Sequence, residues 1–415
     1  MAKAKRKQVA EVSTQATSEH NEVSIPEHLL AGNGGAQNSI LMRMLDTRTS
    51  KRVLRVAPED MGLAEHLPFP FMALVGQIEM RTALLLSVIN PNVGGVLLIG
   101  PRGTGKTTAA RGLADLLPTI EESTCQFGDM PEDYALLGPD GVCEECAAKL
   151  AAGESITRRV PVSLVELPLN ARLEDVVGGI NERIALQQNR VRLERGILSR
   201  ADRNILYVDE VNLLHNEIVD AILDAAAQGH FTVRRGPMTA TYRSRFVLLG
   251  SMNPEEGRLR PQIMDRFGLR VMVSGLESGD DRITVYDRVY AFRANPRSFI
   301  YMFDEDTYEA REDIRAAIQL LPTVEFPYEV QALGLQLIKE LKIHSHRAEF
   351  TMFEAARAYA AADARGVVTI DDLKAVAPMA LRMRNSEFMD AFFDAQRAED
   401  ERIGQALSHL EKTTN

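Results

Sequence analysis

One segment of the sequence has the residue types and spacing of a phosphate-binding loop. The run from Gly100 to Thr107 reads GPRGTGKT and matches the pattern G-x-x-x-x-G-K-[ST] in full. Glycines let the backbone curl and point its N–H groups at phosphate oxygens, and the following helix adds its positive end. We therefore expect ATP to be bound by Gly100, Gly103, Thr104, Gly105, Lys106, Thr107 and Thr108.

Charged and hydroxyl side chains around this loop predict hydrolysis with Mg²⁺ as the second cofactor. Lys106 would contact the β- and γ-phosphates, and the Thr107 hydroxyl would be a Mg²⁺ ligand. Asp209 and Glu210 directly follow the apolar run 205–208. Asp209 would hold Mg²⁺ and Glu210 would orient or deprotonate the attacking water. An Asp-Glu pair is common at strand ends, but downstream of a complete phosphate loop it is a strong signal.

Two further residues lie where they could act on the γ-phosphate. Asn253 follows an apolar run at 246–249 and would help to place the water, although an Asn-Pro turn residue is the alternative. Arg266 ends a short predicted helix, from which it could reach the phosphate of a neighbouring subunit. A surface salt bridge is the alternative for Arg266.

The elements that must position these residues alternate between strands and helices. Apolar runs at 96–99, 163–167, 205–208, 246–249 and 269–273 predict buried parallel strands. Helices are predicted at 72–89 and 106–117. The pattern predicts an α/β fold with a parallel sheet between helices. After Ser274 the periodicity is almost only helical.

These patterns divide the chain into four parts. We predict a mostly disordered N-terminal extension (1–67), a phosphate-loop core (68–275), an all-helical lid domain (276–384) and a charged C-terminal helix or tail (385–415). An insertion around 121–160 contains all three cysteines.

Composition limits the class of protein. The 415 residues carry a formal net charge of −10, which disfavours nucleic acid as a partner. Three cysteines are too few for a disulfide framework, and no apolar run reaches the length of a membrane span. We expect a cytoplasmic protein.

The cysteines leave three interpretations open. Cys143 and Cys146 form a C-x-x-C pair, and Cys125 is the third cysteine. A structural zinc site requires four ligands, so zinc would need three thiolates with a water, or a site shared between subunits. A redox dithiol and unligated loop thiols are the alternatives.

Beyond these motifs, the chain resembles the AAA+ ATPase subunit of magnesium chelatase between about Phe69 and Arg384. The matching segments are 73–77, 100–107, 161–170, 205–214, 250–257 and 259–268. The runs VDEVNLL (208–214) and NPEEG (253–257) are more specific than a phosphate loop alone. The long N-terminal extension, the Cys-containing insertion and Glu354 depart from the family pattern.

The resemblance implies the function of a motor subunit. Asn253 corresponds to the sensor-1 asparagine, Arg266 to an arginine finger acting across a subunit boundary, and Arg347 to a sensor-2 arginine in the lid. It implies a homo-oligomeric ring, a hexamer, that couples ATP hydrolysis to Mg²⁺ insertion into protoporphyrin IX in chlorophyll or bacteriochlorophyll biosynthesis. The implied partners are an AAA+ subunit with an integrin-like domain and a large porphyrin-binding subunit. The alternatives are a cobalt-chelatase-like ATPase and a chaperone of a von Willebrand A protein.

Overall fold

The computed structural model describes most of the chain between Leu67 and Asn385, with short segments outside it. The described residues are 23–24, 41, 53–54, 67–125, 128–180, 193–235, 238–385, 391, 396 and 399–403. The predicted N-terminal extension and the predicted charged tail therefore lie largely outside the described residues. None of the described helices combines the length and the apolar character that a membrane crossing requires.

Within these ranges, the central sheet has five parallel strands in the order β13-β3-β12-β9-β6. The strands are β3 (Val96–Ile99), β6 (Leu164–Leu167), β9 (Ile205–Val208), β12 (Val247–Met252) and β13 (Leu269–Met272). Leu249 of β12 pairs with Val96 of β3 and with Tyr207 of β9. The predicted α/β fold with a parallel sheet between helices is confirmed.

Alternate side chains of the central strands enter two separate hydrophobic clusters, one on each face of the sheet. Val96 and Leu98 belong to the first cluster, whereas Leu97 and Ile99 belong to the second. All four are buried. A strand has a side-chain period of two, so a sheet covered on both faces needs continuous apolar runs such as VLLI.

Helices cover both faces. The helices α2 (Ile78–Ile89) and α3 (Lys106–Leu113) pack into the first cluster, and α9 (Asn216–Gln228) packs into the second. Shorter helices contribute to the second cluster: α6 (Leu173–Val177), α8 (Ile197–Arg200) and α10 (Pro261–Arg266).

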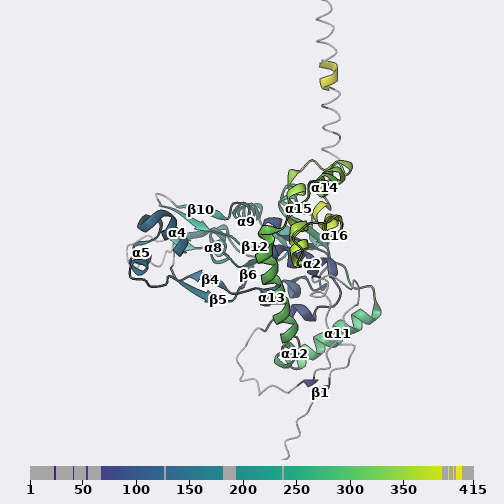
Figure 1. Cartoon of the computed structure of the whole chain (residues 1–415), viewed down its shortest axis with the longest axis horizontal. Coiled ribbons are helices and arrows are strands. Elements are labelled where there is room, and N and C mark those ends of the chain that lie inside the picture. The colour runs from purple at the N-terminus through teal and green to yellow at the C-terminus, as the bar shows by residue number, and fades with distance from the viewer. Residues whose placement is uncertain are drawn as a thin grey trace, which may run out of the picture.

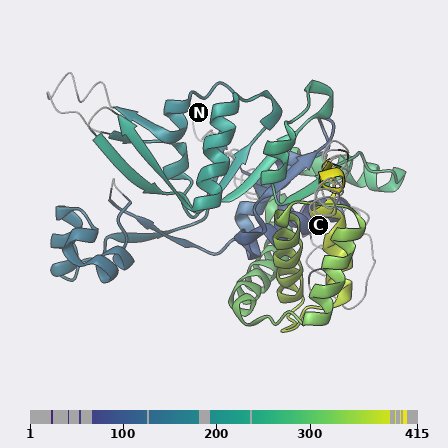
Figure 2. The ribbon, with the colours of Figure 1, turned by 90° about the horizontal axis from the view of Figure 1, so that it is seen from above.

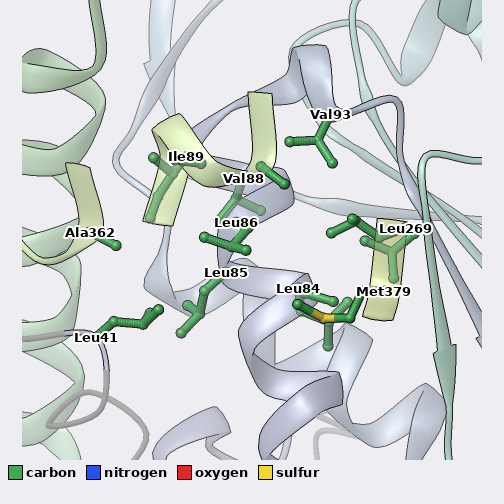
Figure 3. Packing of buried hydrophobic residues seen from close by; sticks show 14 of the residues in the cluster. Leu41, Leu84, Leu85, Leu86, Val88, Ile89, Val93, Leu269, Ala362 and Met379 are labelled. Carbon is green, nitrogen blue, oxygen red and sulfur yellow. The ribbon is translucent and has the colours of Figure 1, made fainter. Parts of the chain in front are cut away.

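The chain after the sheet is helical, as predicted. It contains α11 (Gly279–Ala294), α12 (Pro296–Met302), α13 (Asp304–Leu320), α14 (Tyr328–Glu340), α15 (His346–Ala362) and α16 (Ile370–Leu381). Helix α15 packs against α2, so that Ala362 and Met379 share the first cluster with Leu84 and Leu269 of the core (Figure 3). Leu41 also joins this cluster.

Two antiparallel ribbons extend the core. Strands β4 (Ile120–Ser123) and β5 (Thr157–Val160) carry α4 (Pro131–Leu137) and α5 (Glu144–Ala151) away from the body of the protein (Figures 1 and 2). Strands β10 (His230–Arg235) and β11 (Met238–Arg243) form the second ribbon. The remaining pairs are β7 (Gly178–Ile180) with β8 (Leu193–Arg195), and β1 (Val23–Ser24) with β2 (Val53–Leu54).

The predicted helix 72–89 was too long at its start. Phe71–Ala73 is a single 3₁₀ turn, and α2 begins only at Ile78. Gly76 and Gln77 have left-handed backbone angles (φ 60° and 50°), which interrupt any helix through this segment. The interruption leaves a loop at 74–77, and Leu74, Val75 and Gln77 of this loop line a cavity.

Candidate functional site

The motif residues meet where three neighbouring strands end. Strands β3, β12 and β9 are adjacent, and the phosphate loop, Asn253 and the Asp209–Glu210 pair follow their carboxyl ends. Together they line a cavity of 320 Å³ that also includes Arg102 and Ser251. In a parallel sheet all carboxyl ends lie at one edge, so residues distant in sequence converge there.

Lys106 is held inside the phosphate loop. Its side chain is buried and its Nζ donates to the carbonyl oxygens of Gly100 and Pro101, each at 2.7 Å. Burial lowers the pKa of Lys106 from its ordinary value, against the opposing influence of Asp209 and Glu210. Lys106 also lines the cavity, so triphosphate oxygens bound there could accept its hydrogen bonds in place of the two carbonyl oxygens.

A tyrosine hydroxyl joins the two expected Mg²⁺ ligands. The hydroxyl of Tyr207 lies 2.9 Å from Thr107 Oγ1 and donates to Asp209 Oδ1 at 3.0 Å. Burial raises the pKa of Tyr207 to about 12, so it stays protonated. The Ser251 hydroxyl also donates to Asp209. Hydroxyl and carboxylate oxygens are hard ligands that suit Mg²⁺, so the donor set fits this ion.

Glu210 has an unusual backbone and a cationic partner. It lies in the left-handed region (φ 50°), and its N–H donates to Ser251 Oγ at 3.1 Å. Its carboxylate pairs with Arg102 at 2.8 Å, and Arg102 also pairs with Glu256 at 2.6 Å. The carboxylate that was predicted to activate water is therefore engaged in an ion pair with Arg102.

Asn253 has the predicted position and also makes the turn that was the alternative. It is buried and lines the cavity, while its side-chain oxygen accepts the N–H of Glu255 at 3.3 Å. Fixing the oxygen orients the amide group. A turn and a site role are therefore compatible.

A second, more apolar cavity of 450 Å³ adjoins the first. Gly103, Thr104, Gly105 and Thr108 line both cavities. The loop before α2 contributes Leu74 and Val75, and the helical region contributes Leu276, Val289 and Arg288. Arg288 is buried and donates to the carbonyl of Ala73 at 2.8 Å, which fixes the loop to α11. An apolar slot next to a phosphate loop suits a nucleotide base.

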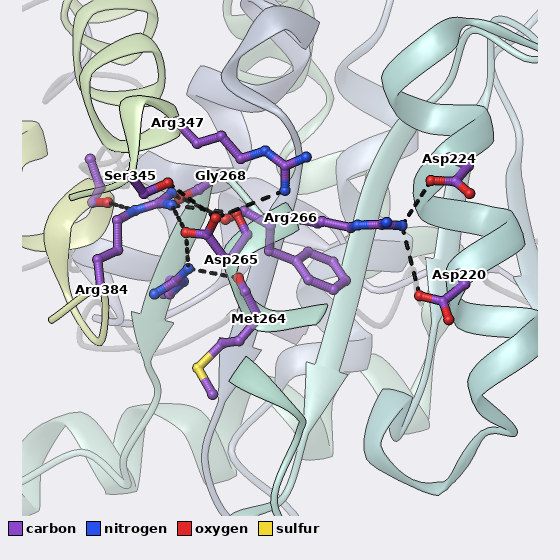
Figure 4. A network of polar contacts seen from close by, with 12 residues as sticks. Asp220, Asp224, Met264, Asp265, Arg266, Gly268, Ser345, Arg347 and Arg384 are labelled. Carbon is purple, nitrogen blue, oxygen red and sulfur yellow. Dashed lines mark hydrogen bonds and ion pairs between the residues drawn. The ribbon is translucent and has the colours of Figure 1, made fainter. Parts of the chain in front are cut away.

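Arg266 and Arg347 line a different cavity, of 200 Å³, together with Asp224 and Asp265. Arg266 Nη1 lies 2.8 Å from Asp224 and 3.7 Å from Asp220, and Arg347 lies 3.9 Å from Asp265 (Figure 4). The two predicted catalytic arginines are therefore brought together with each other, but not with the phosphate loop of the same chain.

Comparison of the sequence with known proteins shows the family to which this chain belongs. Residues 181–262 match the family model "Magnesium chelatase, subunit ChlI", and residues 334–405 match "AAA lid domain". A relative from Methanocaldococcus jannaschii, named a magnesium-chelatase subunit ChlI homolog, is 41% identical over 84% of this chain and 93% of its own length. The chain belongs to the magnesium-chelatase subunit ChlI family.

A second relative gives the same result. The magnesium-chelatase 38 kDa subunit of Acidiphilium rubrum is 43% identical over 76% of this chain and 90% of its own length. A solved structure describing the complex between subunits BchI and BchD of magnesium chelatase is 37% identical, covers 79% of this chain and 99% of that chain, and has a TM-score of 0.43.

In this ChlI-family chain, sequence reasoning missed the polar residues that support the motif residues. Tyr207 and Ser251 each lie two positions before a predicted site residue, Asp209 and Asn253 respectively. Residues two apart on a strand face the same side, so this spacing was an available signal. No local signal marked Arg288, because its role depends on the contact between α11 and the distant turn Phe71–Ala73.

Proposed function

We propose that this chain is the ATP-hydrolysing motor subunit of a magnesium-chelatase-type complex. In this proposal, a homo-oligomeric ring couples ATP hydrolysis to metal insertion into protoporphyrin IX by partner subunits, in chlorophyll or bacteriochlorophyll synthesis. One observation carries the proposal: Lys106, Asp209, Glu210 and Asn253 line one cavity, while Arg266 lines another. Such a hydrolytic site is complete only when a second copy supplies the arginine.

The residues of the first cavity suggest a division of roles. The loop glycines and Lys106 bind the triphosphate, and Thr107 and Asp209 would hold Mg²⁺, with Tyr207 orienting both. Bound Mg²⁺ would neutralise charge on the phosphate oxygens. Glu210 orients the attacking water, and it can do so only after Arg102 moves off its carboxylate.

The surface around the third cavity would meet the neighbouring copy. Arg266 and Arg347 have 31% and 54% of their side chains exposed, so both can reach outward. Both would then act on the neighbour's nucleotide, which extends the predicted finger role of Arg266 to Arg347. We propose a hexamer, with the integrin-like AAA+ subunit and the large porphyrin-binding subunit as its partners.

Mixing variants tests the shared site. Arg266→Ala and Glu210→Gln should each hydrolyse little ATP alone. Co-assembled at equal amounts in a ring, about a quarter of the interfaces would combine an intact Glu210 with an intact Arg266, so about a quarter of wild-type turnover should return. A mixture of Arg347→Ala with Glu210→Gln tests in the same way whether Arg347 acts on the neighbour's nucleotide. Absence of recovery at every ratio, in rings of confirmed size, would contradict a site shared between copies.

A further inference from the structure

Strands β4 and β5 carry a small head, residues 124–156, that includes α4 and α5. This head contains a cluster of metal-binding side chains that the ATPase site does not use. We propose that Cys125, Asp129, Cys143 and Cys146 bind one structural Zn²⁺ ion. Sequence alone offered three thiols and no fourth ligand. Folding brings Asp129 to the thiols and completes a set of four.

The spacing of the ligand atoms fits tetrahedral zinc. One ligand atom from each of the four residues lies within 4.8 Å of all the others. Cys125 Sγ is 3.6 Å from Cys143 Sγ and 3.4 Å from Asp129 Oδ2. Zn–S bonds of ~2.3 Å and Zn–O bonds of ~2.0 Å at tetrahedral angles require edges of ~3.8 Å for S···S and ~3.5 Å for S···O. These two edges therefore already lie within about 0.2 Å of the required lengths.

Where the structure describes the head, it shows no hydrophobic core that could hold this segment together without a metal. Among its described residues, the buried hydrophobic side chains are those of Met130, Cys146 and Ile156. Helix α4 buries none of its residues, and Leu136 and Leu137 are 81% and 64% exposed. The head also projects from the body on two strands (Figures 1 and 2). Segments of fewer than about 40 residues usually need a metal, disulfides or oligomerisation to fold.

Hydrogen bonds hold the proposed ligands in place, one between two of the ligands and two from residues outside the cluster. Asp129 Oδ2 accepts the N–H of Cys143 at 2.8 Å, and the Asp129 carbonyl accepts the Ser123 hydroxyl at 2.7 Å. Arg195 of β8 donates to the carbonyl of Cys125 at 3.4 Å. Such outer contacts orient the ligands of metal sites, and here they connect the site to β4 and to the core.

The ligand chemistry selects the ion and separates this site from the Mg²⁺ of the ATPase cavity. Thiolates favour Zn²⁺, whereas Mg²⁺ prefers oxygen ligands and water. The three thiols are unbridged, and the 3.6 Å between the sulfurs of Cys125 and Cys143 is longer than the ~2.05 Å of a disulfide bond. Four protein ligands leave no open position, which is typical of structural rather than catalytic zinc.

Metal analysis of the full-length protein tests the proposal. Protein purified under reducing conditions and passed through buffer without chelator should contain about one zinc per chain by mass spectrometry of the metal. Exchange into Co²⁺ should give thiolate-to-cobalt charge-transfer bands and the intense visible bands of a tetrahedral site. Removal of the metal with a strong chelator should open the head to proteases, and Zn²⁺ should restore its resistance while Mg²⁺ should not.

Variants assign the ligands. Cys143→Ser and Cys146→Ser should lose the zinc, and Asp129→Ala should bind it at least tenfold more weakly, whereas Asp129→His should retain it because imidazole is also a zinc ligand. Glu144→Gln, an exposed change inside the same C-x-x-C motif, is the matched control and should keep the full zinc content. If the cysteine variants misfold, the chelator and cobalt experiments on the unmodified protein still decide.

Three results would overturn the proposal. They are a protein without zinc whose head is equally protease-resistant with and without added Zn²⁺, zinc content unchanged in the double variant Cys143→Ser/Cys146→Ser, and a Cys125–Cys143 disulfide as the state isolated from cells. The last would support the redox interpretation instead.

Discussion

Arg266 and Asp224 face each other within one chain, with their nearest nitrogen and oxygen 2.8 Å apart. The arginine extends from the end of α10 toward α9, and Asp220 lies 3.7 Å from the same nitrogen (Figure 4). The guanidinium is therefore directed along the surface by its own chain's carboxylates. A neighbour's phosphate would have to compete with them for this cation.

Arg266→Ala should reduce ATP turnover about 10³-fold, because an arginine finger stabilises charge that develops in the transition state. Binding of a non-hydrolysable ATP analogue should stay within about twofold, which a fluorescence titration would measure. Asp224→Ala should change turnover less than about tenfold, since exposed ion pairs contribute little. Arg260→Ala, which removes an arginine 3.9 Å from Asp220, is the matched control. A large loss of analogue binding in Arg266→Ala would place this residue in its own chain's site.

Analogue binding should depend on pH through Lys106. Burial lowers the pKa of this group below 10.5, and a triphosphate would raise it again on binding. Affinity should therefore be constant below the pKa of Lys106 in the free protein and fall as pH rises above it, starting at a lower pH than for an exposed lysine. Isothermal titration between pH 7 and pH 10 checks this. Lys106→Ala should bind weakly with no such slope, and an identical slope in that variant would assign the effect to another group.

Tyr207→Phe should weaken the response to Mg²⁺ while the fold is retained. The ring stays in the first hydrophobic cluster, but the hydroxyl between Thr107 and Asp209 is lost. A hydrogen bond of this kind contributes about 1 kcal/mol, so the Mg²⁺ concentration for half-maximal turnover should rise about fivefold. Titration of turnover against free Mg²⁺ measures it. An unchanged midpoint would show that the hydroxyl does not position these ligands.

Arg384→Met should destabilise the protein by about 2–4 kcal/mol, because it leaves buried acceptors without a donor. The side chain of Arg384 is fully buried, and it donates to Asp265 at 2.7 Å and to the carbonyls of Ala380 and Gly268 at 2.6 and 2.9 Å. These bonds connect the end of the helical region to the core strands. Urea unfolding checks the size of the effect. Arg158→Met, at an exposed pair, should cost less than about 1 kcal/mol, and equal losses in both variants would contradict the argument.

The sequence by itself determined the sheet and the side chains that meet at its edge. Runs such as VLLI at 96–99 and ILYV at 205–208 are apolar on both faces, so they fit only strands covered on two sides. The phosphate loop and Asp209–Glu210 immediately follow such strands. Parallel strands bring their carboxyl ends to one edge, and these residues therefore meet in one cavity without further information.

Tertiary structure alone decided which residues from distant segments share a surface. Arg266 and Arg347 come together because α15 packs against the core, and Asp129 reaches the thiols because the head folds back on itself. Local patterns record propensities within a few residues, whereas these contacts depend on packing between elements far apart in the chain. The left-handed turn at Gly76 and Gln77 likewise meets distant residues: Leu276 lies where a Cβ on Gly76 would collide, and Gln77 Nε2 donates to the carbonyl of Ser274 at 2.6 Å.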